Sequence, residues 1–279
     1  MLNHRSKRVP GIVFVACGVL AMCGCGKQSS PAPADGTSSS TQVGGGPSTG
    51  AGPSDENTTG CGKAAPAGMT PGTHKITDFS GGGRDDRVYV VTIPEDYDSA
   101  RKYALTLGFH PRNNRAKPRF DLDTTMAGES INVYPQSLDE DGVWDTKGDL
   151  DILYIDDLVS FFKESFCIDE QRVFAGGFSQ GGRMSAVLGC TRGDIYRAVA
   201  VLAAGPPNGT EGDVSIEQCV GDIAYAHING LLDPGRKAIL DYYIELWRTR
   251  NNCSAETEAI QPAPCISYKG CDEPVIQCE

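Results

Sequence analysis

The chain has 279 residues, of which 39% are hydrophobic and 22% charged, and its formal net charge is −11 at pH 7. This length allows one large α/β domain or two small ones. The acidic balance argues against nucleic acid or an anionic bilayer surface as a partner, because binding either would need a basic patch.

The N-terminus has the pattern of an export signal. Basic side chains precede an apolar run at 11–22, which is too short to span a bilayer as a stable helix. We therefore expect residues 1–25 to be a signal peptide. Cys23 or Cys25, lying among small residues after the run, resembles a bacterial lipoprotein processing site and predicts an outer-membrane lipid anchor. Ordinary cleavage and release of the chain is the alternative.

Residues 26–60 are expected to be a disordered linker. Gly, Ser, Pro, Thr and Ala dominate this segment, and large apolar residues are almost absent, so burial cannot offset the entropy of folding. Residues 61–279 then form one domain, which is long enough to bury a substantial core and which we expect to be monomeric.

The cysteines of this domain predict disulfides. Eight lie beyond the linker, and an even number in an exported chain indicates up to four bonds, with the pairing left open. A zinc site made by Cys265, Cys271 and Cys278 is the competing interpretation, although their spacing is not C-x-x-C and the compartment is oxidising. We expect no metal and no organic cofactor.

Strands and helices are predicted to alternate along the domain. Short runs rich in β-branched, aromatic or small apolar residues predict strands at 87–94, 103–110, 131–135, 173–175, 196–202 and 223–228. Apolar residues at helical spacing predict helices at 152–163, from 180 onward, and at 234–252. This alternation predicts an α/β fold with a mostly parallel central sheet flanked by helices, and chemistry at the carboxyl ends of the strands.

The sequence Gly177-Phe-Ser-Gln-Gly181 matches the G-x-S-x-G pattern of a nucleophile turn. It follows a predicted strand and precedes a predicted helix, and its glycines allow the backbone to close around the serine. We therefore expect Ser179 to be a nucleophile. A serine hydroxyl needs a base to take its proton and an acid to orient that base.

Asp233 is the candidate acid, since it follows a predicted strand in Asn229-Gly-Leu-Leu-Asp-Pro234. The alternative is a helix N-cap, which is common for an aspartate directly before proline. Asp222 is a weaker candidate because it precedes that strand.

An oxyanion hole would take one backbone N–H from Gln180 and one from the loop after the second strand. Pro111 has no N–H, so Arg112 is the expected second donor, with a solvated loop charge as the alternative. Trp144, in a charged loop, and His110 are weaker candidates for binding the substrate. Plain packing is the alternative for Trp144.

The base is harder to find. His4 belongs to the signal peptide, His74 lies before the first predicted strand, His110 lies on the predicted oxyanion loop, and His227 lies inside an apolar strand. No histidine follows Asp233.

Several segments resemble the family of secreted feruloyl esterases and polyhydroxybutyrate depolymerases. In chain order they are Cys61-Gly-Lys, Leu107-Gly-Phe-His110, Val133-Tyr-Pro-Gln136, Cys167-Ile-Asp-Glu-Gln-Arg-Val-Phe-Ala-Gly-Gly-Phe-Ser-Gln-Gly-Gly182 and Asn229-Gly-Leu-Leu-Asp-Pro234. The resemblance implies an α/β-hydrolase with Ser179 as nucleophile and Asp233 as acid. It also implies hydrolysis, through an acyl-enzyme, of an ester from the plant cell wall or of a polyester.

Two departures from the family pattern stand out. Family members have His-Gly where this chain has His110-Pro111, and they continue past a segment like Pro274-Val-Ile-Gln-Cys278 into a loop that carries the catalytic histidine. We therefore expect the sequence to be truncated at its C-terminus. The alternative is a hydrolase-fold lipoprotein without its base, which binds ester or carbohydrate ligands.

Overall fold

The computed structural model describes residues 59–147, 150–204, 219–233 and 236–279. The expected signal peptide, both candidate lipidation sites (Cys23 and Cys25) and nearly all of the expected linker lie outside these residues, as does Pro234. None of the helices in the described ranges combines the length and the apolar character needed to cross a membrane.

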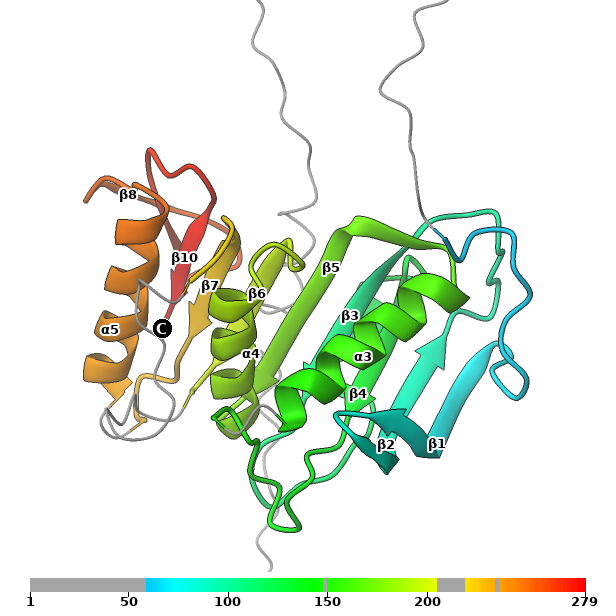
Figure 1. The fold of residues 1–279 in the computed structure, drawn as a ribbon. Coiled ribbons are helices and arrows are strands. Elements are labelled where there is room, and N and C mark those ends of the chain that lie inside the picture. The colour runs from blue at the N-terminus through cyan, green and yellow to red at the C-terminus, as the bar shows by residue number, and fades with distance from the viewer. Residues whose placement is uncertain (1–58, 148–149, 205–218, 234–235) are drawn as a thin grey trace, which may run out of the picture.

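One sheet of ten strands forms the centre of the domain (Figure 1), in the order β1-β2-β4-β3-β5-β6-β7-β10-β9-β8. The strands are β1 (Gly72–Gly81), β2 (Arg84–Ile93), β3 (Tyr103–Phe109), β4 (Ser130–Pro135), β5 (Ile168–Phe178), β6 (Ala198–Leu202), β7 (Ala224–Ile228), β8 (Thr257–Ala259), β9 (Ile266–Tyr268) and β10 (Val275–Cys278). The run from β4 to β10 is parallel, and the strands outside it are antiparallel. The expected mostly parallel sheet is confirmed.

The strands that the sequence predicts most clearly are the buried ones. Every residue of β3, β4, β6 and β7 is buried, as expected where both faces of a parallel sheet are covered. The edge strand β1 instead alternates between exposed and half-buried positions. His74 belongs to β1, so its expected position before the start of the sheet is wrong; the polar composition of this edge strand concealed it.

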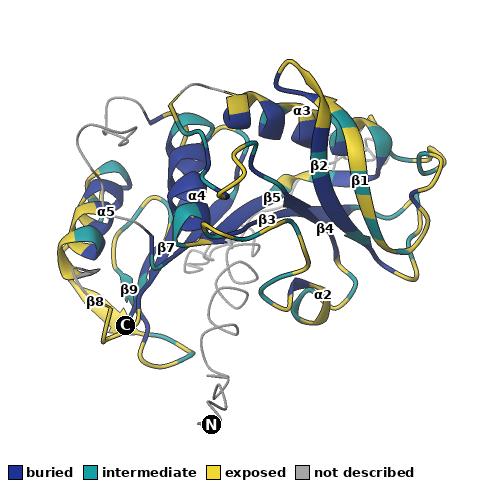
Figure 2. Cartoon of the chain, turned by 90° about the horizontal axis from the view of Figure 1, so that it is seen from below, coloured by how far each residue is buried: buried dark blue, intermediate teal, exposed yellow. Residues whose placement is uncertain are grey.

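The helices are α2 (Leu122–Thr125), α3 (Leu150–Ser165), α4 (Gln180–Thr191) and α5 (Arg236–Arg250). Figure 2 shows α3, α4 and α5 on one face of the sheet and the short α2 on the other. Helix α4 lies between α3 and α5, and all its residues from Gly181 to Cys190 are buried. The start of this helix is therefore held firmly against the strand ends beneath it.

Disulfides close the domain at four places. The bonds are Cys61–Cys167, Cys190–Cys219, Cys253–Cys271 and Cys265–Cys278. The expected disulfides are confirmed, and Cys265, Cys271 and Cys278 are each engaged in one, so these thiols do not form the alternative zinc site. Within the described ranges, no cluster of three or more ligand side chains suited to a metal occurs.

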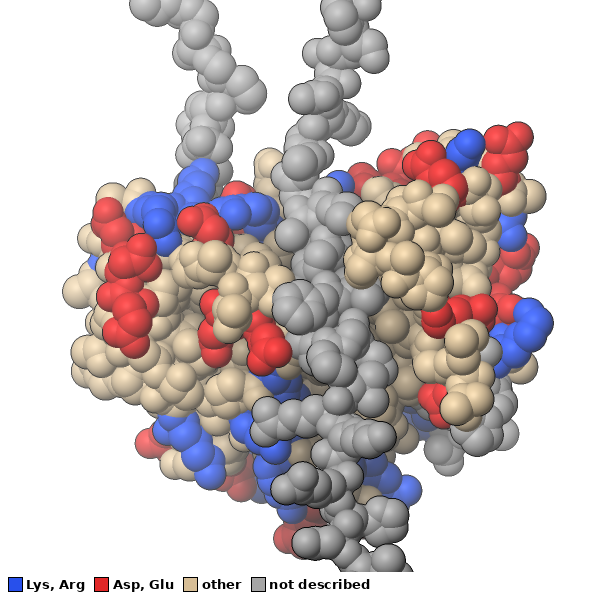
Figure 3. Space-filling model, turned by 180° about the vertical axis from the view of Figure 1, so that it is seen from behind, with Lys and Arg blue, Asp and Glu red and all other residues tan. Residues whose placement is uncertain are grey.

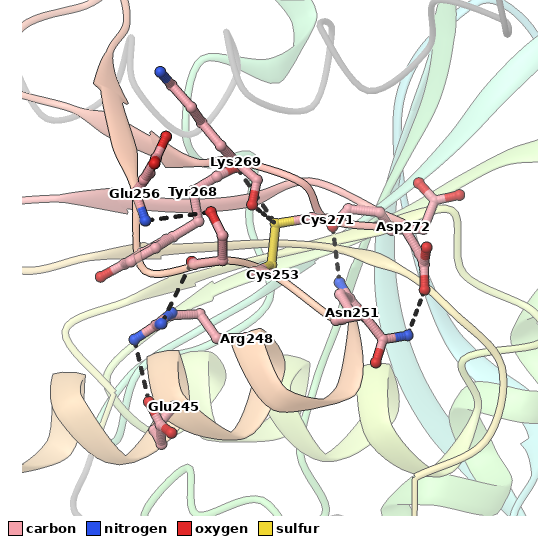
Figure 4. Close-up of a disulfide and its surroundings, with 12 residues drawn as sticks. Glu245, Arg248, Asn251, Cys253, Glu256, Tyr268, Lys269, Cys271 and Asp272 are labelled. Atoms are coloured by element: carbon pink, nitrogen blue, oxygen red, sulfur yellow. Dashed lines mark hydrogen bonds and ion pairs between the residues drawn. A yellow bond between two sulfur atoms is a disulfide. The ribbon is translucent and has the colours of Figure 1, made fainter.

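Figure 4 shows how the Cys253–Cys271 bond joins the end of α5 to the segment before β10. Beside it, the N–H of Asp272 donates to the carbonyl of Asn251 at 2.8 Å, and the amide of Asn252 donates to the Asp272 carboxylate at 2.6 Å. The bond and these two contacts fix β10 beside β7.

Charged side chains of both signs occur on the outside of the domain. On the face drawn in Figure 3, acidic and basic residues form separate small groups.

Candidate active site

The carboxyl ends of four parallel strands meet at one edge of the sheet. Phe178, Leu202, Ile228 and Cys278 lie in register in a single row across β5, β6, β7 and β10. The residues directly after this row therefore share the edge where a parallel sheet carries its site. Ser179 follows the row on β5. The loop after β7 begins two strands away, about 10 Å at normal strand spacing.

Ser179 occupies a strained turn between β5 and α4. Its φ of 57° and ψ of −114° are rare for a residue with a side chain. The Ser179 N–H donates to the carbonyl of Leu202 at 2.9 Å, which ties the turn to β6. The hydroxyl caps no N–H of α4, and the residue is partly exposed. The side chain is thus presented at the sheet edge with its oxygen free for chemistry.

The glycine after Gln180 brings the end of β3 against the start of α4. A Cβ on Gly181 would lie 2.3 Å from the carbonyl oxygen of Phe109 and 2.8 Å from that of His110. No side chain fits at this distance, so glycine is required here. The loop after β3 consequently lies beside the first turn of α4, as an oxyanion loop must.

The two expected oxyanion donors differ in their surroundings. Gln180 is the first residue of α4, and the first N–H groups of a helix have no acceptor within it. Arg112 lies in an exposed turn directly after Pro111. Together they remain the predicted pair of donors.

His110 is completely buried and held by both ring nitrogens. Its Nδ1 is 2.9 Å from the carbonyl oxygen of Pro111, and its Nε2 accepts the N–H of Ser137 at 3.1 Å. These partners require the neutral ring with the proton on Nδ1. Burial, with a smaller contribution from the nearby Arg119 and Arg115, lowers the pKa of His110 to about 4. His110 therefore braces the loop and is not exposed to a ligand.

Trp144 packs beneath the same loop and does not overhang the site. Its side chain is only 3% exposed, its ring contacts Phe109 edge to face at 5.2 Å between centroids, and its indole N–H donates to the carbonyl of His110 at 2.9 Å. The packing interpretation accounts for these contacts, and no substrate surface remains on this ring. The burial of Trp144 could not be predicted from its charged local sequence, because the residues that it contacts lie far away in the sequence.

A buried ion pair anchors the loop that carries Trp144. Arg87 on β2 and Asp151 on α3 pair with each other, and both are almost fully buried. The Asp151 carboxylate also accepts the N–H groups of Leu138 at 3.2 Å and Asp145 at 2.8 Å. The segment between β4 and α3 is thus fixed at both ends, and it in turn holds His110.

Asp233 lies at the edge that carries Ser179. It closes a turn in which its N–H donates to the carbonyl of Gly230 at 3.0 Å, and it is exposed. The loop is tied to β10 where the N–H of Asn229 donates to the carbonyl of Cys278 at 3.0 Å. Asp222 precedes β7 and lies at the opposite edge, as expected.

In the part of the chain that the structure describes, no imidazole is hydrogen-bonded to Ser179 or Asp233. His74, on β1, contacts the carbonyl oxygen of Thr70. His227 is buried against α5, where its Nδ1 is 2.9 Å from the hydroxyl of Tyr225. Burial lowers the pKa of His227 to about 3, so it is neutral.

Sequence reasoning missed one residue beside Ser179. Arg183, in the first turn of α4, is 7% exposed, and its Nε and Nη2 have no hydrogen-bond partner among the described residues. The available signal was a charged residue inside an otherwise small or apolar helix.

Comparisons with known proteins agree with this geometry. A scan against protein-family models finds no match. Feruloyl esterase C from Emericella nidulans is 32% identical over 236 residues, which cover 78% of this chain and 80% of that protein. The chain belongs to the feruloyl esterase family. Probable feruloyl esterase C from Aspergillus flavus, another member, is 32% identical over 187 residues, 64% of this chain, and the match spans only 63% of the relative's length.

Solved structures confirm the expected α/β-hydrolase fold. An acetyl xylan esterase from Aspergillus awamori superposes with a TM-score of 0.56 at 15% identity, covering 74% of this chain and 92% of that one. A ferulic acid esterase from Anaeromyces mucronatus, solved with ferulic acid, superposes with a TM-score of 0.52 at 21% identity, covering 68% and 83%. At these identities the likeness establishes the fold alone.

Proposed function

We propose that this family member is a serine carboxylic ester hydrolase acting on feruloyl esters of plant cell-wall material. The observation that carries the proposal is the strained backbone of Ser179, with φ of 57°, at the carboxyl edge of a parallel sheet. Strain of this kind persists only where the surrounding structure holds it, and it occurs preferentially at active sites.

In the proposed reaction, the Ser179 oxygen attacks the ester carbonyl carbon and loses its proton to a base. Collapse of the tetrahedral intermediate releases the alcohol and leaves an acyl-enzyme, which water then hydrolyses to the acid. The N–H groups of Gln180 and Arg112 would stabilise the oxyanion, and Asp233 would orient the base. A polyester is the other substrate class that the sequence resemblance implies.

Exposed apolar side chains at this edge suit an aromatic acyl group. Phe178, directly before Ser179, is 45% exposed, and Leu231 and Leu232, just before Asp233, are 67% and 96% exposed. Large apolar side chains left exposed on a protein surface favour an apolar ligand.

A second candidate function is ligand binding without turnover. It is favoured by the lack, among the described residues, of an imidazole that contacts Ser179 or Asp233. Losing the base of a triad lowers turnover by a factor on the order of 10⁴ to 10⁶ while leaving the binding groups in place.

Fluorophosphonate labelling together with methyl ferulate hydrolysis tests both candidates. An esterase should be labelled at Ser179 and should release ferulate, and Ser179→Ala should abolish both. Ser185 is the matched control, because its hydroxyl donates to the Gly181 carbonyl inside α4 at 3.0 Å and Ser185→Ala leaves Ser179 intact. Binding of methyl ferulate without labelling or turnover would support the second candidate and contradict the first.

We further propose that the chain is exported and held at the cell surface as a monomer through a lipid on Cys23 or Cys25. Metabolic labelling with a palmitate analogue, in cells that express Cys23→Ala or Cys25→Ala, tests this. Loss of label in one variant identifies the modified cysteine, whereas an unlabelled parent chain contradicts the anchor.

A further inference from the structure

Two of the three guanidinium nitrogens of Arg183 are buried without a hydrogen-bond acceptor. Its Nε and Nη2 are shielded from solvent and donate to no acceptor among the described residues, and the residue as a whole is only 7% exposed. Arginine stays protonated inside proteins, and buried charges are normally paired. Arg192, the C-cap residue of the same helix, differs, because its guanidinium contacts the Asp156 carboxylate at 2.8 Å. Among the described residues, Arg183 therefore lacks the anionic partner that a buried arginine normally has.

The side chain leans toward the nucleophile turn. Arg183 lies one helical turn after Ser179, and its backbone N–H donates to the carbonyl of Ser179 at 3.0 Å. Residues four apart lie on the same side of a helix, and helical side chains tilt toward the N-terminus. A long side chain at this position is thus directed to the edge of the sheet where Ser179 sits.

The face of α4 that bears Arg183 turns toward β7. Gly181 packs against the end of β3, and a Cβ on Gly182 would lie 3.0 Å from the carbonyl of Leu202 on β6. Arg183 follows Gly182 by roughly 100° around the axis of α4, so it lies beyond the side of the helix that contacts β6. Cys190, seven residues on and on the same face, is bonded to Cys219 just before β7. From these contacts we infer that the face of α4 that bears Arg183 is directed toward β7.

We propose that Arg183 binds a carboxylate of the ligand held at Ser179, which makes it a specificity-determining residue for acidic ligands. This inference rests on the proposed function, because it uses the same site. A planar guanidinium pairs with a carboxylate through two parallel hydrogen bonds, and the N-terminus of the 12-residue helix α4 favours negative charge at the same place. The carboxylate has two possible sources: the acid that ester hydrolysis releases beside Ser179, or a uronate of the polysaccharide.

Binding to the Ser179→Ala chain separates these possibilities without turnover. We would measure the dissociation constants of ferulate, methyl ferulate and glucuronate by calorimetry at pH 7, using the oxidised full chain. Ferulate is expected to bind at least tenfold more tightly than methyl ferulate if the acid is the ligand. Tight binding of glucuronate, with no preference between the two ferulates, would identify the uronate.

Variants of Arg183 then test the role of its charge. Arg183→Gln should abolish the preference for the carboxylate and leave methyl ferulate binding within twofold, while Arg183→Lys should retain part of it. Because Gln removes an unpaired buried charge, the thermal midpoint should not fall. Arg192→Gln, at the other end of α4, is the matched control and should keep the full preference.

Two results would overturn the proposal. If Arg183→Gln binds the preferred carboxylate as tightly as its parent, or if the parent shows no carboxylate preference, Arg183 has no such role and the proposed esterase function is unaffected. If the parent binds neither ester nor acid, the proposed function fails together with this inference.

Discussion

A methyl group on Gly177 would lie 2.3 Å from the carbonyl carbon and oxygen of Gly181. Both atoms belong to the backbone, so no side-chain rotation relieves the clash. The two outer glycines of the G-x-S-x-G pattern thus face each other across the turn, and their close contact accompanies the positive φ of Ser179. The motif is a packing requirement as well as a chemical signature.

Gly177→Ala should consequently open the turn. We expect a loss of about 3 kcal/mol in the free energy of unfolding, because the backbone of β5 or α4 must move, and a loss of fluorophosphonate labelling at Ser179. Gly176→Ala is the control: its Cβ would lie 3.6 Å from the nearest atom, the carbonyl oxygen of Ala200, which is ordinary contact. Urea unfolding and labelling of both variants check this, and equal behaviour of the two would contradict it.

The sequence predicts the parts of this fold that are locally determined. Buried parallel strands such as β3 and β4 are continuous apolar runs, and α4 begins at Gln180 where its pattern indicates. The same is true of the nucleophile turn, because glycine at two fixed positions reports a close backbone approach.

Three of the missed strands lack such signals. β1 is an edge strand with polar side chains, and β8 and β9 have three residues each, none of them buried. Their positions depend on neighbours and on the bonds at Cys253 and Cys265. Disulfide pairing follows from the path of the folded chain, so the spacing of the cysteines alone leaves it open.

The roles of His110 and Trp144 depend on contacts that are distant in the sequence. The indole of Trp144 meets a carbonyl that is 34 residues earlier in the chain. Its local sequence is charged and gives no sign of burial. Arg183 is the reverse case, since its charge indicates exposure while the packing of α4 buries it.

Trp144→Phe should weaken the brace under the loop after β3. The variant keeps an aromatic ring but leaves the buried carbonyl of His110 without its donor, which costs about 1–3 kcal/mol. Trp247→Phe is the matched control, because the buried indole N–H of Trp247 has no partner among the described residues, so its removal breaks none of their hydrogen bonds. Chemical denaturation should show the larger loss for Trp144→Phe, and only this variant should slow labelling of Ser179. If Trp247→Phe costs as much, the hydrogen bond is not responsible.

Asp151→Asn should be strongly destabilising. Arg87 would remain buried beside a neutral partner, and breaking a buried pair in this way costs about 3–5 kcal/mol. Asp86→Asn removes the partner of Arg84 in an exposed pair, where solvent screens the charges, and should leave the unfolding free energy nearly unchanged. Thermal or urea unfolding of the two variants measures the difference. Similar small losses in both would show that the buried pair does not anchor the loop.

Stability should fall as the solution becomes acidic, because two histidines are buried in the neutral form. Folding lowers the pKa of His110 to about 4 and that of His227 to about 3, whereas an unfolded histidine titrates near 6.5. Below about pH 6.5 the unfolded chain binds more protons than the folded one, so acid favours unfolding. The contribution of each neutral ring to the free energy of unfolding is fully present above about pH 6.5. It is lost as the pH falls from there through the folded pKa of that ring.

His110→Asn isolates one of these contributions. A single histidine adds up to about 1.4 kcal/mol per pH unit to the slope of unfolding free energy against pH, and about 3 kcal/mol in all for His110 between pH 6.5 and 4. Urea unfolding at several pH values should therefore give a shallower slope for His110→Asn than for the parent chain, whatever the offset at pH 7. His227→Asn should reduce the slope similarly, and its effect should extend to lower pH because its folded pKa is lower. An unchanged slope in either variant would mean that the ring is protonated in the folded chain, and that its burial does not set its charge.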